Sequence, residues 1–198
     1  MAAPASVLFV CTGNVCRSPA AELLLRDLLL RRGADDVAVS SAGTHALVGA
    51  GVAGPTATLL RQLGVDASGF RARQLRPQDV GAADLVVTMT REQRAAVVRA
   101  EPRAVRRTFT LLELATLVQA DVEPGSRGGP ARGPAPTTGW AQLPAVATAN
   151  RGLCLGRLDD VDVTDPYRRP ERVHRQVLAT VAAAVETVAR AVPPAGSR

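Results

Sequence analysis

The sequence contains no lysine and few aromatic residues. All 24 basic residues in the 198-residue chain are arginine, and 18 acidic residues leave a formal net charge of +6. Aromatic residues make up only 3% of the chain, so the core must be built from leucine, valine and alanine. The arginines are scattered and do not alternate with aromatic side chains, as a nucleic-acid-binding surface requires. We therefore expect no nucleic-acid partner.

Cysteine is also scarce, because Cys11, Cys16 and Cys154 are too few and too unevenly spaced for a disulfide framework. No apolar run approaches the length of a membrane span, and the first residues lack the basic region of a signal peptide. These absences predict a cytoplasmic protein that does not insert into membranes. No cluster of histidine and cysteine has metal-ligand spacing, so we expect no metal and no cofactor.

The order of apolar segments predicts an α/β fold in one domain over residues 1–198. Short apolar runs at residues 6–10, 37–41, 84–89 and 105–111 are typical of buried strands. Helical patterns alternate with them, at residues 19–32, 55–63, 91–100, 112 to about 119, 140–150 and 171–192. The alternation predicts three layers, with a central four-stranded parallel sheet flanked by helices. The proline- and glycine-rich stretch at about 121–139 is predicted to be a surface insertion or loop.

The stretch CTGNVCRSP follows the first predicted strand and begins the first predicted helix. Ligands bind at the carboxyl ends of strands in such sheets, which places this loop at a site. Gly13 allows a tight turn, and successive backbone N–H groups at a helix N-terminus form a nest for an anion. Arg17 adds a planar pair of donors that suits phosphate oxygens. The sequence therefore predicts a phosphate-binding loop after strand 1.

A nucleophile and a general acid are also present. Cys11 lies at the mouth of the predicted nest, where the same donors favour the reactive thiolate. The distant DVTDPY segment offers Asp165 on a turn that Pro166 stiffens, with Tyr167 positioned to wall a pocket. An Asp-Pro pair alone also fits a simple turn into the last helix. Together with the cysteine loop, however, it favours hydrolysis of a phosphate ester.

These residues resemble the low-molecular-weight protein tyrosine phosphatase family of the bacterial type. The resemblance includes CTGNVCRSPAAE and DPY, and also SAGT at 41–44, RARQL at 71–75 and ADLVVTM at 83–89. It implies a metal-independent, two-step mechanism in which Cys11 forms a phosphocysteine and Arg17 clamps the phosphoryl group. Asp165 is implied to protonate the leaving phenol and then to activate water. Ser18 is implied to hydrogen-bond the thiolate, and Asn14 and Ser41 to support the loop.

The resemblance also implies how substrate and partner bind. The substrate is expected against Thr12, Gly13, Asn14, Val15, Cys16, Ser18, Leu47 and Tyr167. Small aliphatic residues at the position of Leu47 are typical of bacterial members linked to exopolysaccharide tyrosine kinases. The implied partner is a phosphotyrosine-containing protein, and an autophosphorylated bacterial tyrosine kinase is one candidate. Phe70 stands where a histidine is common, which leaves one polar contact to the loop in question.

Other activities remain open on the same fold. Protein arginine phosphatases resemble C-T-G-N-T-C-R-S, with a threonine where this chain has Val15. Val15 offers apolar bulk against an aromatic ring, which favours phosphotyrosine, although Thr12 is shared with the arginine-specific group. Thioredoxin-coupled arsenate reductases need relay cysteines, and none lies between Cys16 and Cys154; a version that uses an external thiol stays open. A non-catalytic phosphate-binding module is disfavoured, because the predicted nucleophile, clamp and acid are all present.

Cys16 has two interpretations. It packs the loop as a small buried residue, or, as the family resemblance implies, it forms a reversible disulfide with Cys11 that prevents overoxidation. Cys154 is predicted to be a buried filler. His45 is expected to be a solvated loop residue beside the pocket, and His174 to be structural or exposed.

Overall fold

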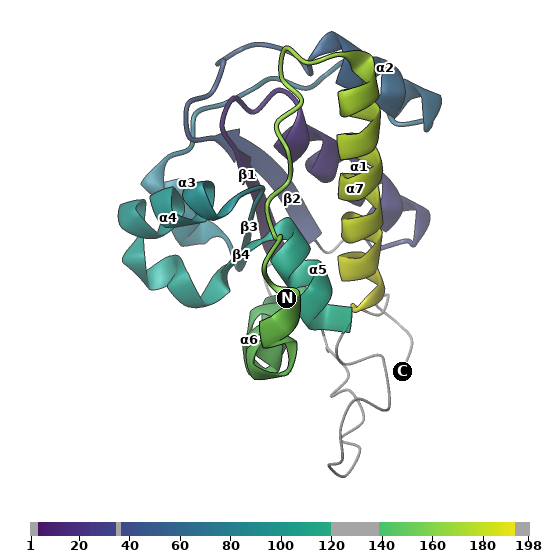
Figure 1. The fold of residues 1–198 in the computed structure, drawn as a ribbon. Coiled ribbons are helices and arrows are strands. Elements are labelled where there is room, and N and C mark those ends of the chain that lie inside the picture. Colours follow the sequence, from purple (N-terminus) through teal and green to yellow (C-terminus); the bar gives the residue numbers. More distant parts are fainter. Residues whose placement is uncertain (1–3, 35–36, 120–138, 193–198) are drawn as a thin grey trace.

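The computed structural model describes residues 4–34, 37–119 and 139–192, and every structural statement below concerns these residues. Four strands form one parallel sheet in the order β2-β1-β3-β4. They are β1 (Ala5–Cys11), β2 (Val37–Gly43), β3 (Leu85–Thr88) and β4 (Thr108–Thr110). The sheet confirms the predicted fold class (Figure 1).

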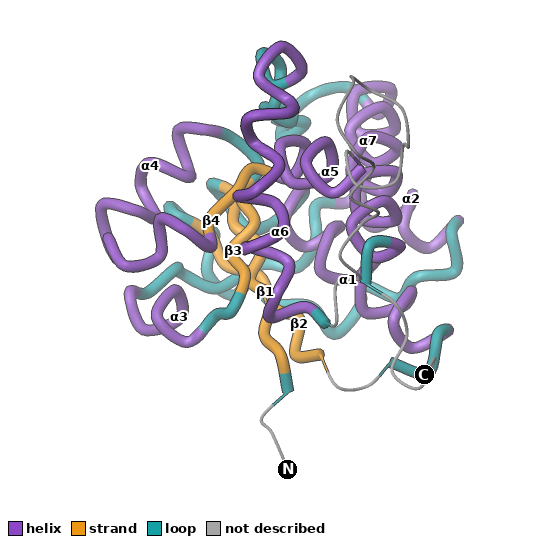
Figure 2. Tube along the Cα trace, turned by 90° about the horizontal axis from the view of Figure 1, so that it is seen from below, coloured by secondary structure: helices purple, strands orange, loops and turns teal. Residues whose placement is uncertain are grey.

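Helices cover both faces of the sheet (Figures 1 and 2). On one side α1 (Arg17–Arg31), α5 (Leu111–Gln119) and α7 (Glu171–Arg190) pack together, and α2 (Gly54–Gln62) packs on α7. The other side holds α3 (Pro77–Ala82), α4 (Arg91–Ala100) and the 3-10 helix η1 (Pro102–Arg107). The short helices η2 (Trp140–Gln142), α6 (Leu143–Asn150) and η3 (Arg151–Arg157) follow the undescribed segment, and α6 packs on α5.

The alternation of side chains along β1 explains why this strand lies at the centre of the sheet. Val7 and Phe9 point into the larger core, which α1, α5 and α7 complete. Leu8 and Val10 point into a smaller core with residues of α3 and α4. Successive side chains of a strand face opposite sides, so a continuous apolar run suits a strand covered on both faces. β1 therefore places Cys11 at the centre of the carboxyl edge.

Two local predictions differ from the structure. The strand predicted over 105–111 is wrong for its first part, because η1 extends to Arg107 and β4 pairs only from Thr108. Pro102 begins η1, and the Glu101 side chain accepts a hydrogen bond from the Arg103 N–H, so a local turn outcompetes the sheet. The helices α3 and η3 were not predicted, since both are too short to show a clear period.

The predicted insertion at 121–139 lies almost wholly outside the described residues, which resume at Gly139. Its role and the extent of the domain over 1–198 therefore stay predictions. Trp140, the second described residue after this gap, is buried in the larger core. None of the described helices combines the length and the apolar character that crossing a membrane requires.

Candidate active site

The loop between β1 and α1, residues 11–17, is called the Cys11 loop below. The segment after β2 lies behind the Cys11 loop and donates hydrogen bonds to the carbonyl oxygens of that loop. Four peptide N–H groups of this segment donate hydrogen bonds of 2.8–3.0 Å to the loop: those of Thr44, His45, Leu47 and Ala53 bond to the carbonyl oxygens of Cys11, Thr12, Gly13 and Val15. A trans peptide unit points its N–H away from its C=O. The loop therefore turns its N–H groups to the opposite side.

On that side the Cys11 loop presents unpaired donors. The peptide N–H groups of Gly13 and Cys16 belong to two of these units and find no acceptor among the described residues. Asn14 has a φ of 54°, in the left-handed region, which bends the loop between them. Successive N–H groups around such a bend form a concavity for an anion. This is the arrangement that the sequence predicts after strand 1.

The Cys11 sulfur is buried and receives two hydrogen bonds from its own loop. The Ser18 hydroxyl donates to it at 2.9 Å, and the peptide N–H of Asn14 donates at 3.3 Å. Only 2% of Cys11 is exposed. Donors aimed at sulfur stabilise the negative charge of a thiolate. The loop is thus built around Cys11 as an acceptor.

The Asn14 side chain fixes the direction of these bonds. Its amide group donates to Ser18 at 2.9 Å and to Ser41 of β2 at 2.8 Å. Its carbonyl oxygen accepts the peptide N–H of Arg73 at 2.9 Å. Because Ser18 accepts from Asn14, its own proton is left for Cys11. Asn14, Ser18 and Ser41, which the sequence assigned to loop support, therefore form one network.

Phe70 does not leave this network incomplete. The acceptor of Asn14 is satisfied by the backbone of Arg73, whatever the side chain at position 70. Phe70 instead packs with Val15 and Cys16 in a small apolar cluster beneath the loop. Every residue except proline has a peptide N–H, so the sequence does not show which one bonds to Asn14. The family resemblance therefore could not identify this partner.

Glu22 extends the network and was missed by the sequence analysis. It lies on α1, is 5% exposed, and forms an ion pair of 2.9 Å with Arg26. Burial raises the pKa of Glu22, while a hydrogen bond with Ser41 opposes this shift. A glutamate one helical turn after the loop and four residues before an arginine is a signal that the sequence does contain.

Arg17 and Asp165 are in contact although they lie 148 positions apart in the sequence. One guanidinium nitrogen of Arg17 donates to Asp165 at 2.6 Å, and another donates to the carbonyl oxygen of Val163 at 3.0 Å. The Arg17 side chain is 4% exposed, and its Nε is buried without a partner in the described part of the chain. An unpaired buried N–H is costly. It adds a further donor beside the N–H groups of the loop.

A cavity of about 150 Å³ brings the predicted site residues together. It is lined by Cys11, Thr12, Gly13, Val15, Cys16, Arg17, His45, Leu47, Asp165 and Tyr167. Asn14 and Ser18 do not line it and lie behind it in the supporting network. Leu47 and Tyr167 are part of its wall and remain 43% and 39% exposed. The cavity thus joins polar groups with apolar surface.

A buried polar chain runs behind the cavity from Cys16. Burial raises the pKa of Cys16 to about 11, so this residue is a neutral thiol at pH 7. Its hydrogen-bonding partner Thr56 lies 2.8 Å from Nδ1 of His174. His174 on α7 is buried and not exposed, and burial lowers its pKa. All three cysteines are free, and Cys154 lies buried near the carbonyl oxygen of Thr116, away from the cavity lining.

Within the described ranges, no group of three or more histidine, cysteine or acidic side chains is arranged to hold a metal ion. The donors that face the cavity are instead backbone N–H groups and a guanidinium. These groups bind oxyanions and not cations.

Comparison with known proteins agrees with this geometry. Residues 6–129 match the family model "Low molecular weight phosphotyrosine protein phosphatase". The chain is 35% identical over 119 residues to a protein-arginine-phosphatase of Geobacillus stearothermophilus, covering 60% of this chain and 77% of that protein. It is also 35% identical over 118 residues to the probable low molecular weight protein-tyrosine-phosphatase EpsP of Ralstonia solanacearum, covering 60% and 76%.

A solved structure has the same fold over nearly the whole chain. The YwlE arginine phosphatase from Geobacillus stearothermophilus superposes with a TM-score of 0.66 at 26% identity, covering 94% of this chain and 92% of that one. The matching family model extends over the Cys11 loop and over nearly all of the sheet that positions it. The chain therefore belongs to the low molecular weight phosphotyrosine protein phosphatase family of hydrolases.

Proposed function

We propose that this chain hydrolyses phosphotyrosine in proteins through a phosphocysteine intermediate formed on Cys11. The observation that supports the proposal is the single cavity that Cys11, Arg17 and Asp165 share. The N–H groups of the Cys11 loop and the Arg17 guanidinium would hold the three equatorial phosphoryl oxygens and stabilise them in the transition state. The chemistry then needs only a nucleophile in line and a proton for the leaving group.

In the first step the Cys11 thiolate forms a bond to phosphorus, and the bond to the phenolic oxygen breaks. Asp165 gives its proton to that oxygen, which matters because a tyrosine phenol has a pKa near ~10 and leaves poorly as an anion. In the second step the Asp165 carboxylate takes a proton from water as this water attacks phosphorus. Inorganic phosphate leaves and the Cys11 thiolate is restored. Ser18, 2.9 Å from the sulfur, stabilises it in both steps.

The wall of the cavity favours an aromatic ester over phosphoarginine. Val15 is buried in that wall and packs with Phe70, and Leu47 and Tyr167 supply further apolar surface. A phenyl ring gains from apolar contact, whereas a guanidinium loses hydration there without a partner. We infer the same preference in the cell, where the partner is a phosphotyrosine-bearing protein and an autophosphorylated tyrosine kinase is the first candidate. A reducing cytoplasm is the compartment that suits three free cysteines.

The test is turnover of matched phosphotyrosine and phosphoarginine peptides, with Cys11→Ser as the inactive control. We expect release of phosphate from the tyrosine peptide, and a phosphorylated Cys11 in the intact mass of Asp165→Ala during turnover. A clear preference for phosphoarginine would replace the substrate assignment, and Val15→Thr should move the wild type in that direction. The same Asp165→Ala variant serves to capture the physiological phosphoprotein.

A further inference from the structure

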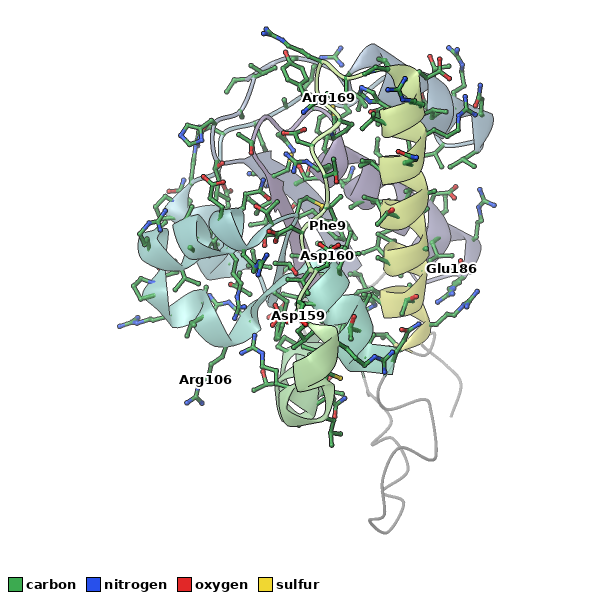
Figure 3. The ribbon with its side chains drawn as sticks, viewed as in Figure 1. Phe9, Arg106, Asp159, Asp160, Arg169 and Glu186 are labelled. Carbon is green, nitrogen blue, oxygen red and sulfur yellow. The ribbon has the colours of Figure 1, made fainter. Side chains whose placement is uncertain are left out.

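Asp165 lies in a segment that has no regular structure of its own. Residues 159–170, called the Asp165 segment below, connect η3 to α7 without a helix or strand. In Figure 3, Asp159 and Asp160 lie low on this segment and Arg169 lies at its upper end, where α7 begins. Such a segment needs anchors if one carboxyl group is to stay at a fixed distance from a nucleophile. The contacts of this segment with the rest of the fold show where these anchors are.

The start of α4 holds the Asp165 segment just before Asp165. The Asp162 carboxylate accepts the peptide N–H of Arg91 at 2.8 Å, and it also accepts the Arg91 Nε–H at 3.3 Å. The peptide N–H of Val163 donates to the carbonyl oxygen of Met89 at 2.8 Å. Arg91 is the first residue of α4, so Asp162 lies where the helix dipole favours a negative charge.

The same turn of α4 also holds the Cys11 loop. Gln93, 5% exposed, donates from its side chain to the hydroxyl of Thr12 at 3.1 Å. The side-chain carbonyl oxygen of Gln93 accepts hydrogen bonds from the peptide N–H groups of Met89 and Thr90, at 3.0 and 3.1 Å. Thr90 caps the helix and completes a capping box with Gln93. One rigid turn therefore contacts both the loop of the nucleophile and the segment of the acid.

A further anchor is Arg17, which has a second task. Its guanidinium donates to Val163 and Asp165, and it is also the proposed clamp for the phosphoryl group. Donors used on phosphate are no longer available to the Asp165 segment. The contacts at the start of α4 are independent of phosphate, and they continue to hold the Asp165 segment during the reaction.

We propose that Asp162 is a positioning residue that, through its bonds to Arg91 at the start of α4, holds Asp165 at working distance from the leaving group. The inference rests on the proposed function, in which Asp165 is the general acid. Asp162 itself does not touch the substrate. Its loss should therefore impair proton transfer to the leaving group and leave the reactivity of Cys11 unchanged.

The experiment compares kcat/KM for phenyl phosphate and p-nitrophenyl phosphate in the wild type, Asp162→Ala, Asp162→Asn and Asp160→Ala. Phenol is a poor leaving group that needs the proton, whereas p-nitrophenol is a far stronger acid and needs it less. A general acid contributes roughly 10²–10⁴-fold, so a displaced one should lose about tenfold on phenyl phosphate and less than about threefold on p-nitrophenyl phosphate. The rate of Cys11 alkylation by iodoacetate should stay at its wild-type value.

Asp160→Ala is the matched control. Asp160 lines the same open groove of about 440 Å³ as Asp162 but makes no hydrogen bond or ion pair with a described residue. The control therefore removes an equal charge without the anchor, and it should behave as wild type on both esters. Asp162→Asn retains an oxygen that can accept the Arg91 N–H, and it should recover part of the lost activity. It also decides the question if Asp162→Ala fails to fold.

Three outcomes would overturn the inference. They are an equal loss on both esters, a full rate on phenyl phosphate in both Asp162 variants, and the same loss in Asp160→Ala. A wild type inactive on both esters would overturn the proposed function and this inference with it. An active wild type with unaffected Asp162 variants would overturn the inference alone.

Discussion

Asn14 gives the sharpest test of how the Cys11 loop is held. It is completely buried, its φ is 54°, and its side chain forms three hydrogen bonds, to Ser18, Ser41 and the backbone of Arg73. Replacement by alanine removes all three bonds and leaves an unpaired N–H on Arg73. It also places in the left-handed region a residue whose side chain cannot form the local hydrogen bonds that let asparagine adopt this conformation. Both effects can be converted into free energies.

Each buried hydrogen bond contributes about 0.5–1.5 kcal/mol net, so three contribute about 1.5–4.5 kcal/mol. The left-handed backbone costs an alanine about 1–2 kcal/mol. Asn14→Ala should therefore lower the free energy of unfolding by about 2.5–6.5 kcal/mol, a large part of the roughly 5–15 kcal/mol of a typical domain. Asn14→Gly loses the same bonds but tolerates the backbone, and it should be about 1 kcal/mol more stable than the alanine variant.

Asn14→Asp separates stability from chemistry. Its carboxylate still accepts the Arg73 N–H but donates to neither serine, so the Ser18 hydroxyl is free to donate to the carboxylate instead of Cys11. This variant should keep more stability than Asn14→Ala while its Cys11 is alkylated more slowly at neutral pH. Urea unfolding followed by the single buried tryptophan, Trp140, measures the first quantity, and iodoacetate kinetics measure the second. An alanine variant within about 1 kcal/mol of wild type, or a glycine variant less stable than alanine, would refute the energetic reasoning.

Two further predictions concern the buried groups behind the cavity. Because burial lowers the pKa of His174 from 6.5, the unfolded chain binds a proton first as the pH falls. Stability should be complete above pH 6.5 and should decline below it, and His174→Phe should show a smaller drop in Tm between about pH 7.5 and about pH 5.5; an unchanged drop would assign it to other groups. Peroxide should yield a Cys11–Cys16 crosslink in mass spectra that a thiol reverses with recovery of activity, including in Cys154→Ala. Irreversible loss without the crosslink would leave Cys16 as a packing residue alone.

Where the sequence predicts the fold well, neighbouring residues decide the local structure. The helix at 91–100 has the predicted bounds because Thr90 and Gln93 cap it within one turn. β1 was predictable because a short, continuous apolar run that ends in a turn is typical of a strand covered on both faces. The strand predicted at 105–111 was too long, because pairing with β3 decides where β4 begins and that pairing is not written in the run itself.

The candidate site divides in the same way. Cys11 and Arg17 lie in one loop, and their spacing could be recognised directly from the sequence. Asp165 is far along the chain and was found only through its proline turn. The bonds that place it use backbone groups, such as the carbonyl oxygen of Val163 and the N–H of Arg91, which every residue possesses. No residue pattern marks such partners, so only the folded arrangement could identify them.

The polar network beneath the Cys11 loop costs free energy, because its buried polar groups must be desolvated. Asn14, Ser18, Glu22 and Ser41 are each at most 5% exposed, in a region that aliphatic side chains could fill at no cost in desolvation. Apolar contacts are not directional, however, and cannot decide where a hydroxyl proton points. Only a chain of donors and acceptors with every direction fixed leaves the proton of Ser18 for Cys11. The buried polar groups beneath the loop therefore stabilise the fold less than aliphatic side chains would. They are required because a thiolate nucleophile needs oriented donors and not merely a packed site.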